Sequence, residues 1–447
     1  WVFFGLHIDP ESVGIITGDT RENTEAPIIV ETTEILRNQL YDAMHQGLDL
    51  NCDLVILDEA HFLGDADRGV VWEEIMIYLP VRVNLLLLSA TIGNGDDIAA
   101  WLASIRNKTC TVVREEKRPV PLYPMFLHPS GCLHPFLDGK KAGSAVCEFL
   151  KKDKFRHRGS HRPPDYAGII RVLERFNLLP AIFFLKSRAE CDTALACRTG
   201  LSPLKNNDAF ADDLYDLLER FPSLGSHRQI KALRNAGLAA HHGGQLPAWK
   251  LLVEEMMNRG HLRVIFATTT IAAGVNFPAR TIVLFNSDQF NGHDFAALSA
   301  TEFQQMTGRA GRRGQDNIGF MLAVTGRFMD LGHIKEMLSA APEDIMSQLK
   351  NDFAMVLNLM LSQTPADVKK IFEKSLAAWQ QNKIDKKSMS AADRLWKDFS
   401  LHLKFLHGEG FVDAAGRLTE DGRWAARPRL DYPLLVAECL REDAFPV

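Results

Sequence analysis

Two carboxylates and a histidine follow an apolar run in the segment Asp58-Glu59-Ala60-His61. The run, residues 53–57, reads as a buried strand, and parallel α/β sheets bind ligands beyond the carboxyl ends of their strands. At such a place Asp58 can hold Mg²⁺ through water, while Glu59 can orient and deprotonate a water molecule that attacks a γ-phosphate. The alternative for the same pair is an acidic cap of a helix N-terminus.

A hydroxyl-bearing segment, Ser89-Ala90-Thr91, ends the next long apolar run, 28 residues after His61. Hydroxyl residues cap many helices, so this segment alone predicts no chemistry. Its place after the strand that follows Asp58 and Glu59 makes it a candidate part of the same site.

The strongest signal for phosphate chemistry is the segment of residues 305–314, Gln-Met-Thr-Gly-Arg-Ala-Gly-Arg-Arg-Gly. Arg309 and Arg312 are three positions apart, which on a helix puts them on one face. Gly308 and Gly311 allow another surface to approach closely. We therefore expect two guanidinium groups that bind phosphate charge in the manner of arginine fingers. The alternative, a solvated basic start of a helix, does not require glycines at this spacing.

Two more strand ends carry polar residues. One strand is followed by three threonines, beginning at Thr268, and then by a segment that contains Gly274 and Asn276. Hydroxyl groups and a glycine at such a position can bind the phosphates of a nucleotide or of a nucleic-acid backbone, with a plain polar turn as the alternative. His241 and His242 follow another strand, and because adjacent side chains point to different faces, we do not expect them to share a zinc ion.

Strands and helices must position these segments, and the sequence predicts two α/β domains, residues 1–118 and 119–340. A helical pattern runs from Thr32 to about His45, with Thr32 or Thr33 as its N-cap. Near-continuous apolar strands separated by helices predict parallel sheets buried on both faces. The expected strands are residues 13–17, 27–30, 53–57, 85–88, 181–185, 238–241, 263–267 and 281–285.

Proline residues mark the domain boundaries. A proline-rich seam that begins at Pro119 separates the two α/β domains. From Pro342 onward helical patterns dominate, until residues 410–419 read as a short hairpin with a glycine turn. A helix followed by such a hairpin predicts a winged-helix region over residues 341–429, and residues 430–447 read as the start of a helical domain that is cut short.

The order of these segments resembles that of superfamily two helicases of the DEAD/DEAH type, in particular the superkiller and exosome-associated RNA helicase family and its DNA-acting relatives. Gly18-Asp19 and then Thr32-Thr33-Glu34-Ile35-Leu36-Arg37 are similar to that family's "TGD…TTEILR" segment. Residues 305–314 are close to its motif VI, and Asn351–Leu359 is similar to its lead into the winged helix. The resemblance covers essentially the whole chain. It implies two RecA-like parallel-sheet domains and a winged-helix region that couple ATP hydrolysis to movement along nucleic acid.

The resemblance also implies roles for individual residues, with ATP and Mg²⁺ as the cofactors. The implied catalytic residues are Asp58, which holds Mg²⁺ through water, Glu59, Arg309 and Arg312. The implied nucleotide-binding residues are His61, Gly274, Asn276, Gln305 and Gly308, of which His61 and Gln305 also couple the two domains. The implied contacts to sugar and phosphate, which carry little sequence preference, are Gly18, Thr32, Thr33, Arg37, His241 and Thr268. Ser89 and Thr91 link hydrolysis to strand movement. RNA is the expected substrate, single-stranded or partly duplex, with DNA as the alternative.

The sequence departs from this family in its phosphate-binding loop. No Gly-x-x-x-x-Gly-Lys-[Ser/Thr] segment occurs in the 447 residues, although such a loop cradles the β- and γ-phosphates. In the family the loop lies upstream of Gly18, so we expect it before Trp1, and we expect little ATPase activity from the isolated chain. Thr269 stands where many relatives have Glu, so we expect the contacts that couple the two α/β domains to differ in detail from those of the family. Two alternatives remain: a module that binds nucleic acid or a partner without hydrolysing ATP, and a duplex translocase that does not separate strands.

Composition excludes several classes of protein. Hydrophobic residues make up 46% and charged residues 24%, as in ordinary globular proteins. The net charge of −5 does not indicate nucleic-acid binding, so any basic channel must be local. Seven cysteines, an odd number, argue against a disulfide scaffold and favour a reducing cytoplasm. The apolar runs are far shorter than the roughly 18 residues of a membrane span, so we expect no membrane association, and a monomer.

Overall fold

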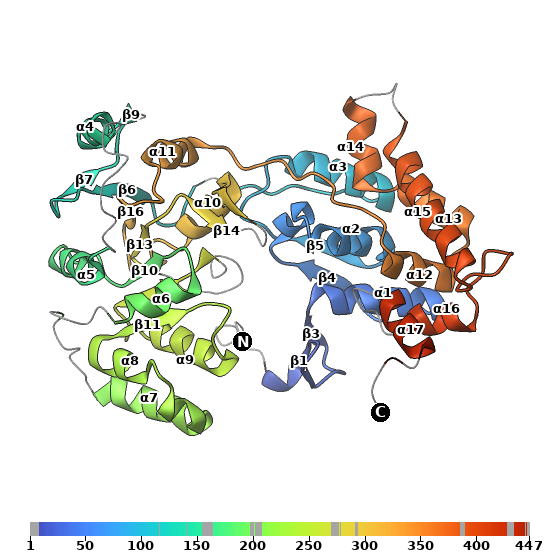
Figure 1. The fold of residues 1–447 in the computed structure, drawn as a ribbon, viewed down its shortest axis with the longest axis horizontal. Helices are drawn as coiled ribbons and strands as arrows, with labels where there is room; N and C mark the ends of the chain where they lie inside the picture. Colours follow the sequence, from blue (N-terminus) through green and yellow to red (C-terminus); the bar gives the residue numbers. More distant parts are fainter. Residues whose placement is uncertain are drawn as a thin grey trace. The chain divides into compact units, whose positions relative to one another are not determined.

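The computed structural model describes residues 9–115, 117–139, 141–153, 164–196, 201, 208–269, 277, 279–290, 294–384, 389–426, 433–442 and 444. The chain forms two compact units, one made of Trp1–Val113 with Asp344–Val447 and the other of Arg114–Glu343 (Figure 1). The four-region division expected from the sequence stays a prediction. No helix in the described part of the chain is long and apolar enough to cross a bilayer.

The α/β part of the first unit contains two small sheets. After a short 3₁₀ helix, η2 (Pro10–Ser12), strand β1 (Val13–Ile16) pairs in parallel with β3 (Ile28–Glu31) and antiparallel with β2 (Arg21–Glu22). Strand β4 (Leu54–Leu57) pairs in parallel with β5 (Asn84–Leu87). All four strands expected in this part of the sequence are therefore present.

The sheet β4–β5 is buried on one face only, so the expected burial of both faces is wrong here. Val55 and Leu57 are 8% and 4% exposed, whereas Leu54 and Ile56, which point to the other face, are 50% and 54% exposed. This alternation follows from the two-residue period of a strand. The buried face packs against α1 (Thr33–Gln46), η3 (Ala60–Gly64), α2 (Gly69–Tyr78) and α3 (Gly95–Arg106).

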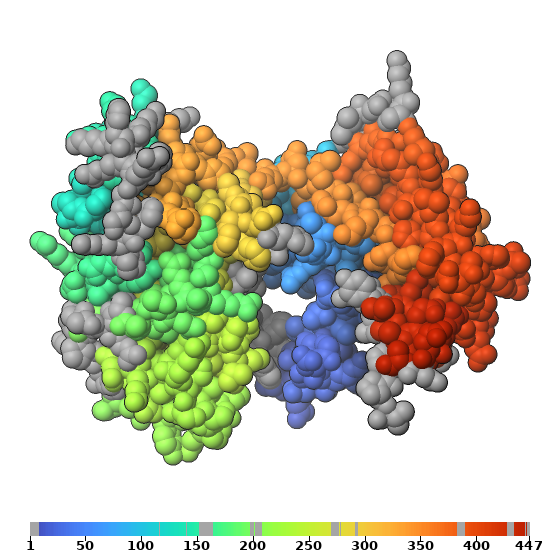
Figure 2. All heavy atoms as spheres, viewed as in Figure 1, coloured from blue at the N-terminus to red at the C-terminus, as the bar shows by residue number. Residues whose placement is uncertain are grey.

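Helix α1 is the helix expected from the sequence. Thr32 is its N-cap, and Gly47, in the left-handed conformation with φ of +64°, ends it. Its last turn faces a second group of helices, since Tyr41 belongs to their apolar core. These helices are α12 (Phe353–Ser362), α13 (Pro365–Glu373), α14 (Leu376–Ile384), α15 (Ala391–Gly408), α16 (Glu420–Ala426) and α17 (Pro433–Arg441). We call residues 344–447 the added region, whose described residues are coloured from orange to red in Figure 2.

The added region contains the expected hairpin after α15. Val412 and Leu418 form an antiparallel bridge, and Gly416 adopts the left-handed conformation in the turn between them. The Asp413 N–H donates to the Arg417 carbonyl at 2.8 Å, which closes the hairpin. The winged-helix assignment of this region stays a prediction.

A buried glutamate on α2 holds the α/β part and the added region together. Glu73 accepts hydrogen bonds from Ser347 Oγ at 2.6 Å and from the Leu376 N–H, at the start of α14, at 2.7 Å. Its neighbour Glu74 joins α2 to α1, because it accepts a hydrogen bond from the Tyr41 hydroxyl. Burial raises the pKa of both carboxyl groups to about 7. Removal of a carboxyl group from water is costly unless hydrogen bonds compensate it, so the contacts of Glu73 fix where the added region attaches.

The second unit is built on one seven-stranded sheet with the order β11-β12-β10-β13-β16-β6-β7. The pairs are parallel except for β6 with β7. The strands are β6 (Leu122–Leu127), β7 (Leu133–Pro135), β10 (Ala181–Phe184), β11 (Leu238–His241), β12 (Val264–Ala267), β13 (Thr281–Leu284) and β16 (Gly319–Val324). The four strands expected here, β10 to β13, are buried at every position, which confirms a parallel sheet covered on both faces.

Helices cover both faces of this sheet. One face packs against α5 (Tyr166–Arg175), α6 (Arg188–Ala194) and part of α8 (Ile230–Ala236). The opposite face packs against α4 (Ser144–Asp153), α7 (Asp208–Arg220), η4 (Pro222–Ser226), α9 (Pro247–Asn258), α10 (Ala300–Gly308) and α11 (Leu331–Ser339). Two short hairpins complete the unit: β8 (Leu137–Asp138) with β9 (Lys141–Ala142), and β14 (Asp288–Phe290) with β15 (Phe295–Ala297).

We predict that the free energy of unfolding of the first unit falls as the pH rises from about 4.5 to 7. The native Glu73 and Glu74 carboxyls, with pKa values raised to about 7, keep protons that the unfolded chain loses near its ordinary value of 4.5. Each group accounts for at most roughly 3 kcal/mol of this change. Urea denaturation at several pH values measures it.

The variant Glu73→Gln keeps one acceptor oxygen, for the Leu376 N–H, and places an amide N–H beside Ser347 Oγ. It cannot ionise, so its stability should fall less steeply with pH. Glu34→Gln, at an exposed carboxyl in the first turn of α1, is the matched control and should retain the wild-type slope. An unchanged slope in Glu73→Gln would contradict the assignment of the pH dependence to this carboxyl.

Candidate functional site

The predicted acidic site lies at the carboxyl end of β4. Asp58 is exposed, and its Oδ1 accepts a hydrogen bond from the Glu59 N–H at 2.9 Å. Glu59 has φ of +59°, in the left-handed region that non-glycine residues rarely occupy, and it caps η3. This turn leads the chain from the strand into η3 with both carboxylates beyond the end of the strand.

His61 lies against the second carboxylate. Its Nδ1 is 3.4 Å from Glu59 Oε2, with the histidine side chain 8% exposed. Burial lowers the pKa of His61, although Asp65 and Asp58 oppose that change. The imidazole is therefore neutral at pH 7, and the Glu59 carboxylate beside it is not paired with an imidazolium.

The hydroxyl segment reaches the same edge of the sheet. The Ala60 N–H donates to the Leu88 carbonyl at 2.8 Å, which links the turn after β4 to the turn after β5. Ser89 Oγ then accepts a long hydrogen bond, 3.4 Å, from the Thr91 N–H. The structure thus brings the acidic and hydroxyl segments together, as the parallel pairing requires, while their catalytic roles stay predictions.

Asp58 suits a divalent cation. An exposed carboxylate beyond a strand end can bind a hydrated Mg²⁺, which keeps most of its water ligands in proteins. Glu59, which already approaches His61, is oriented toward a different partner. The two carboxylates therefore have different surroundings: Asp58 faces solvent and Glu59 lies beside His61. Separate metal-binding and base roles require such a difference.

Four of the predicted nucleic-acid contacts also lie near one another. Strands β1 and β3 are parallel, with Ile16 opposite Glu31, so Gly18 and Thr32 follow the same edge of their sheet. Thr33 and Arg37 are four residues apart on α1 and share a face. Arg37 Nη1 lies 3.7 Å from the buried carboxylate of Glu74.

The second unit holds His241 and Thr268 at one edge of its sheet. His241 pairs with Ala267 in the β11–β12 register, which makes Thr268 its neighbour. The His241 ring is 3% exposed, and its Nε2 lies 3.0 Å from Glu254 Oε1 on α9. Burial favours a structural role for this ring, and its predicted contact with nucleic acid stays a prediction. Gly274 and Asn276 lie outside the described residues.

His242 points away from His241, as expected for adjacent residues of a strand end. Its Nε2 lies 3.5 Å from Asp192 Oδ1 and 3.0 Å from Gln245 Nε2. In the described part of the chain, no group of three or more histidine, cysteine or acidic residues could hold a metal ion.

The arginine pair does not lie on a helix, so the predicted shared helical face is wrong. Helix α10, which carries Gln305, ends at Gly308, with Arg309 as its C-cap residue. Gly311 has φ of +88°, a conformation that ends the helix and that L side chains rarely adopt. Arg309 and Arg312 therefore stand in a turn that leads into the amino end of β16, and we call residues 307–312 the arginine turn.

Asp316 fixes the second of these arginines. Arg312 donates from Nε to Oδ2 at 2.9 Å and from Nη2 to Oδ1 at 3.0 Å, and its backbone N–H donates to Oδ2 at 2.9 Å. Burial works to raise the pKa of Asp316, but the hydrogen bonds from Arg312 outweigh it and hold the pKa below its usual range. A bidentate pair of this kind restricts the guanidinium to one orientation.

The two groups of predicted residues in the second unit lie at opposite edges of its sheet. His241 and Thr268 follow the carboxyl ends of β11 and β12, whereas Arg309 and Arg312 precede the amino end of β16. Ala279, just before β13, bridges to Ala310 in the arginine turn, which places that turn at the amino edge.

Comparison with known proteins agrees with this arrangement of segments. Residues 7–98 match the family "DEAD/DEAH box helicase", and residues 218–314 match the "Helicase conserved C-terminal domain". The chain thus contains segments similar to both domains of a DEAD/DEAH-type helicase. The two RecA-like domains expected from the sequence are in accord with these matches and with the parallel sheets described above.

Similar proteins come from bacteria and from humans. "Probable helicase HelY" of Mycobacterium tuberculosis is 35% identical over 408 residues, which is 83% of this chain and 44% of that protein. The human "Superkiller complex protein 2" is 35% identical over 78% of this chain and 30% of its own length. The human "Exosome RNA helicase MTR4" is 33% identical over 78% of this chain and 35% of its own length. The chain thus spans less than half of each of these relatives, and it resembles the superkiller and exosome helicase family.

Asp316 was not among the predicted site residues. Its signal in the sequence is an acidic residue four positions after Arg312, a spacing that brings opposite charges together within one turn of chain. Glu73 and Glu74 gave no such signal, since their partners are far away in the sequence.

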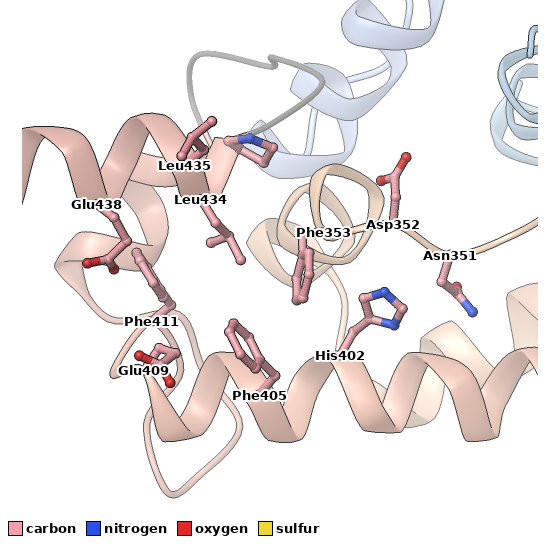
Figure 3. Close-up of a pocket in the computed structure, with 11 residues that line it drawn as sticks. Asn351, Asp352, Phe353, His402, Phe405, Glu409, Phe411, Leu434, Leu435 and Glu438 are labelled. Carbon is pink, nitrogen blue, oxygen red and sulfur yellow. The ribbon is translucent and has the colours of Figure 1, made fainter.

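A cavity of about 510 Å³ lies elsewhere in the first unit, in the added region. Figure 3 shows aromatic side chains of α12 and α15, and residues of α17, around it. None of the predicted site residues lines this cavity. Its residues are Asn351, Asp352, Phe353, His402, Phe405, Glu409, Phe411, Pro433, Leu434, Leu435 and Glu438.

We predict that Gly311→Ala destabilises the second unit more than Gly314→Ala does. Both glycines have positive φ, +88° and +76°, so both substitutions carry a backbone cost of about 1 kcal/mol. A Cβ at Gly311 would lie 2.5 Å from Val120 Cγ1, whereas a Cβ at Gly314 would meet no atom within 4 Å.

The steric contact should therefore add roughly 1–3 kcal/mol at Gly311 alone. Chemical denaturation of the two variants and the wild type measures the difference. Equal losses of stability would show that the arginine turn does not pack tightly against Val120.

Proposed function

We propose that this chain acts in an ATP-dependent RNA helicase that hydrolyses ATP to move along one strand of RNA. The observation that carries the proposal is the gathering of Asp58, Glu59, Ser89 and Thr91 beyond two parallel strands, in a chain that matches both helicase domains. The names of relatives such as the exosome RNA helicase support RNA over DNA as the substrate. We further propose that it acts as a monomer on single-stranded or partly duplex RNA.

Glu59 acts as the general base in this proposal. The carboxylate accepts a proton from the water that attacks the γ-phosphate of ATP, and the bond to the leaving ADP breaks. The neutral His61 beside it supports the orientation of the carboxylate without neutralising its charge. Mg²⁺, held by Asp58 through water, supplies positive charge to the phosphate oxygens. Arg309 and Arg312 are proposed as phosphate-binding groups because they match motif VI of the family.

Gly18, Thr32, Thr33 and Arg37 contact the RNA backbone in this proposal. The edge formed by β1 and β3 presents Gly18 and Thr32, and the first turns of α1 present the other two. Contacts of this kind hold sugar and phosphate, so they bind RNA with little preference for its sequence.

We predict that Glu59→Gln lowers RNA-stimulated ATP hydrolysis by roughly 100-fold or more, because an amide cannot accept the proton. The measurement is steady-state phosphate release, in a form of the protein that includes a phosphate-binding loop. Asp53→Asn, at an exposed carboxylate just before the amino end of β4, is the control and should keep wild-type activity. Wild-type turnover in Glu59→Gln would refute the assigned base.

We predict that Arg37→Gln weakens RNA binding by the 447-residue chain and lowers the slope of log affinity against log salt by about 0.7, the value for one phosphate of a single strand. Fluorescence anisotropy of a labelled oligonucleotide at several salt concentrations measures both. Arg220→Gln, at an exposed arginine paired with Glu255 on the second unit, is the control. If both variants shift the slope equally, Arg37 makes no specific phosphate contact.

A further inference from the structure

Arg118 lies against the end of the helix that precedes the arginine turn. Its Nη2 donates hydrogen bonds to the Thr307 carbonyl and to the Ala310 carbonyl, both at 3.1 Å. Its Nε donates to the carbonyl of Val120, two residues further along its own segment, at 3.3 Å. One guanidinium therefore joins the segment before β6 to the two carbonyls that flank Gly308 and Arg309.

One of the carbonyls that Arg118 binds, that of Thr307, belongs to the last turn of α10, and the other, that of Ala310, belongs to the turn that follows it. The last carbonyls of a helix have no partner within it, and they carry the negative end of the helix dipole. A guanidinium satisfies both requirements because it offers several N–H donors and a permanent positive charge. Burial lowers the pKa of Arg118, because the guanidinium loses part of its contact with water.

Two more contacts tie the same segment to the arginine turn. Val120 is 6% exposed and packs against Gly311, where even a Cβ would lie 2.5 Å from Val120 Cγ1. Pro121 accepts a hydrogen bond from the Gly319 N–H at 2.9 Å, at the point where the chain leaves the turn and enters β16. Residues 118–121 thus contact the arginine turn at Thr307, Ala310 and Gly311, and they also bind the first residue of β16, Gly319.

Asp316 restrains the arginine turn from the other side. It binds Arg312 through the side chain and the backbone, as described above, and Arg280 lies 3.9 Å from it. Arg118 acts on the backbone of the turn, at the Thr307 and Ala310 carbonyls. The two restraints have separate targets, the backbone of the turn for Arg118 and the Arg312 side chain for Asp316.

We propose that Arg118 is a positioning residue, which fixes the backbone of the arginine turn so that Arg309 and Arg312 are presented to phosphate. The phosphate-binding part of this inference rests on the proposed function, whereas the restraint of the turn does not. A misplacement of about 1 Å at a group that stabilises a transition state can cost roughly 100-fold in rate, so a backbone restraint here has a measurable effect.

Hydrogen exchange of the 447-residue chain tests the restraint directly. Arg118→Met keeps an apolar side chain but removes the donors, and Lys117→Met, at an exposed cation next in the sequence, is the matched control. The amide protons of Arg309, Ala310 and Gly311 donate within or next to the turn. We expect them to exchange about tenfold faster in Arg118→Met, with the amides of β10 and β12 unchanged, and no change in Lys117→Met.

Arg118→Lys provides a second variant, since its ammonium keeps donors and a positive charge for the carbonyls but loses the separate Nε donor to Val120. It should give a smaller acceleration than Arg118→Met. It also keeps the test decisive if Arg118→Met fails to fold. Unchanged exchange in the turn of the folded variant, or equal acceleration throughout the second unit, would overturn the proposed restraint.

Kinetics test whether the restraint serves phosphate chemistry. In a form of the protein that hydrolyses ATP, we expect Arg118→Met to lower kcat about tenfold with KM for ATP within twofold, and Arg118→Lys to recover part of the loss. A higher KM with unchanged kcat, or loss of kcat only in proportion to the unfolded fraction, would overturn the positioning role. If the wild type shows no RNA-stimulated ATPase, the proposed function fails, while the exchange experiment still decides whether Arg118 holds the turn.

Discussion

Parallel pairing of strands is the constraint on which the arrangement of this chain depends. Neighbouring parallel strands run in the same direction, so each must be reached by a crossover, and all their carboxyl ends collect at one edge. The pair β4–β5 brings Asp58 and Ser89 to one edge, and β11–β12 brings His241 next to Thr268. Parallel pairing thus makes neighbours of segments separated in sequence by about thirty residues.

Each unit uses an ionisable side chain to hold a helix end. In the first unit the Glu73 carboxyl accepts from an N–H at the start of α14, and in the second the Arg118 guanidinium donates to the Thr307 carbonyl in the last turn of α10. An acidic group at the start of a helix and a basic group at its end both match the direction of the helix dipole. Because polar groups removed from water are costly when unpaired, these contacts determine where the attached segment must lie.

The sequence alone predicts the fully buried strands β10 to β13. It also predicts that the polar residues that follow parallel strands lie together at the carboxyl edge of the sheet. The apolar runs of β10 to β13 identify these segments as strands. Parallel pairing is expected because helices connect the strands. Strand β6 was missed because Pro119, Pro121 and Pro124 read as a boundary, yet Pro124 lies within a strand paired on both sides. The arginine turn was expected as a helix because spacing alone does not show that Gly311 adopts the left-handed conformation. Contacts such as Glu73 with Leu376 join residues 303 positions apart, and no local pattern reveals them.

The backbone conformation of Glu59 is unfavourable for a residue with a side chain. At φ of +59° a glycine would be more stable than any side chain, by about 1 kcal/mol. The position nevertheless holds a carboxylate, so folding alone does not explain the residue found there. Selection for thermal stability alone would replace Glu59 by glycine and remove the base proposed above, so under that proposal stability and activity compete at this residue.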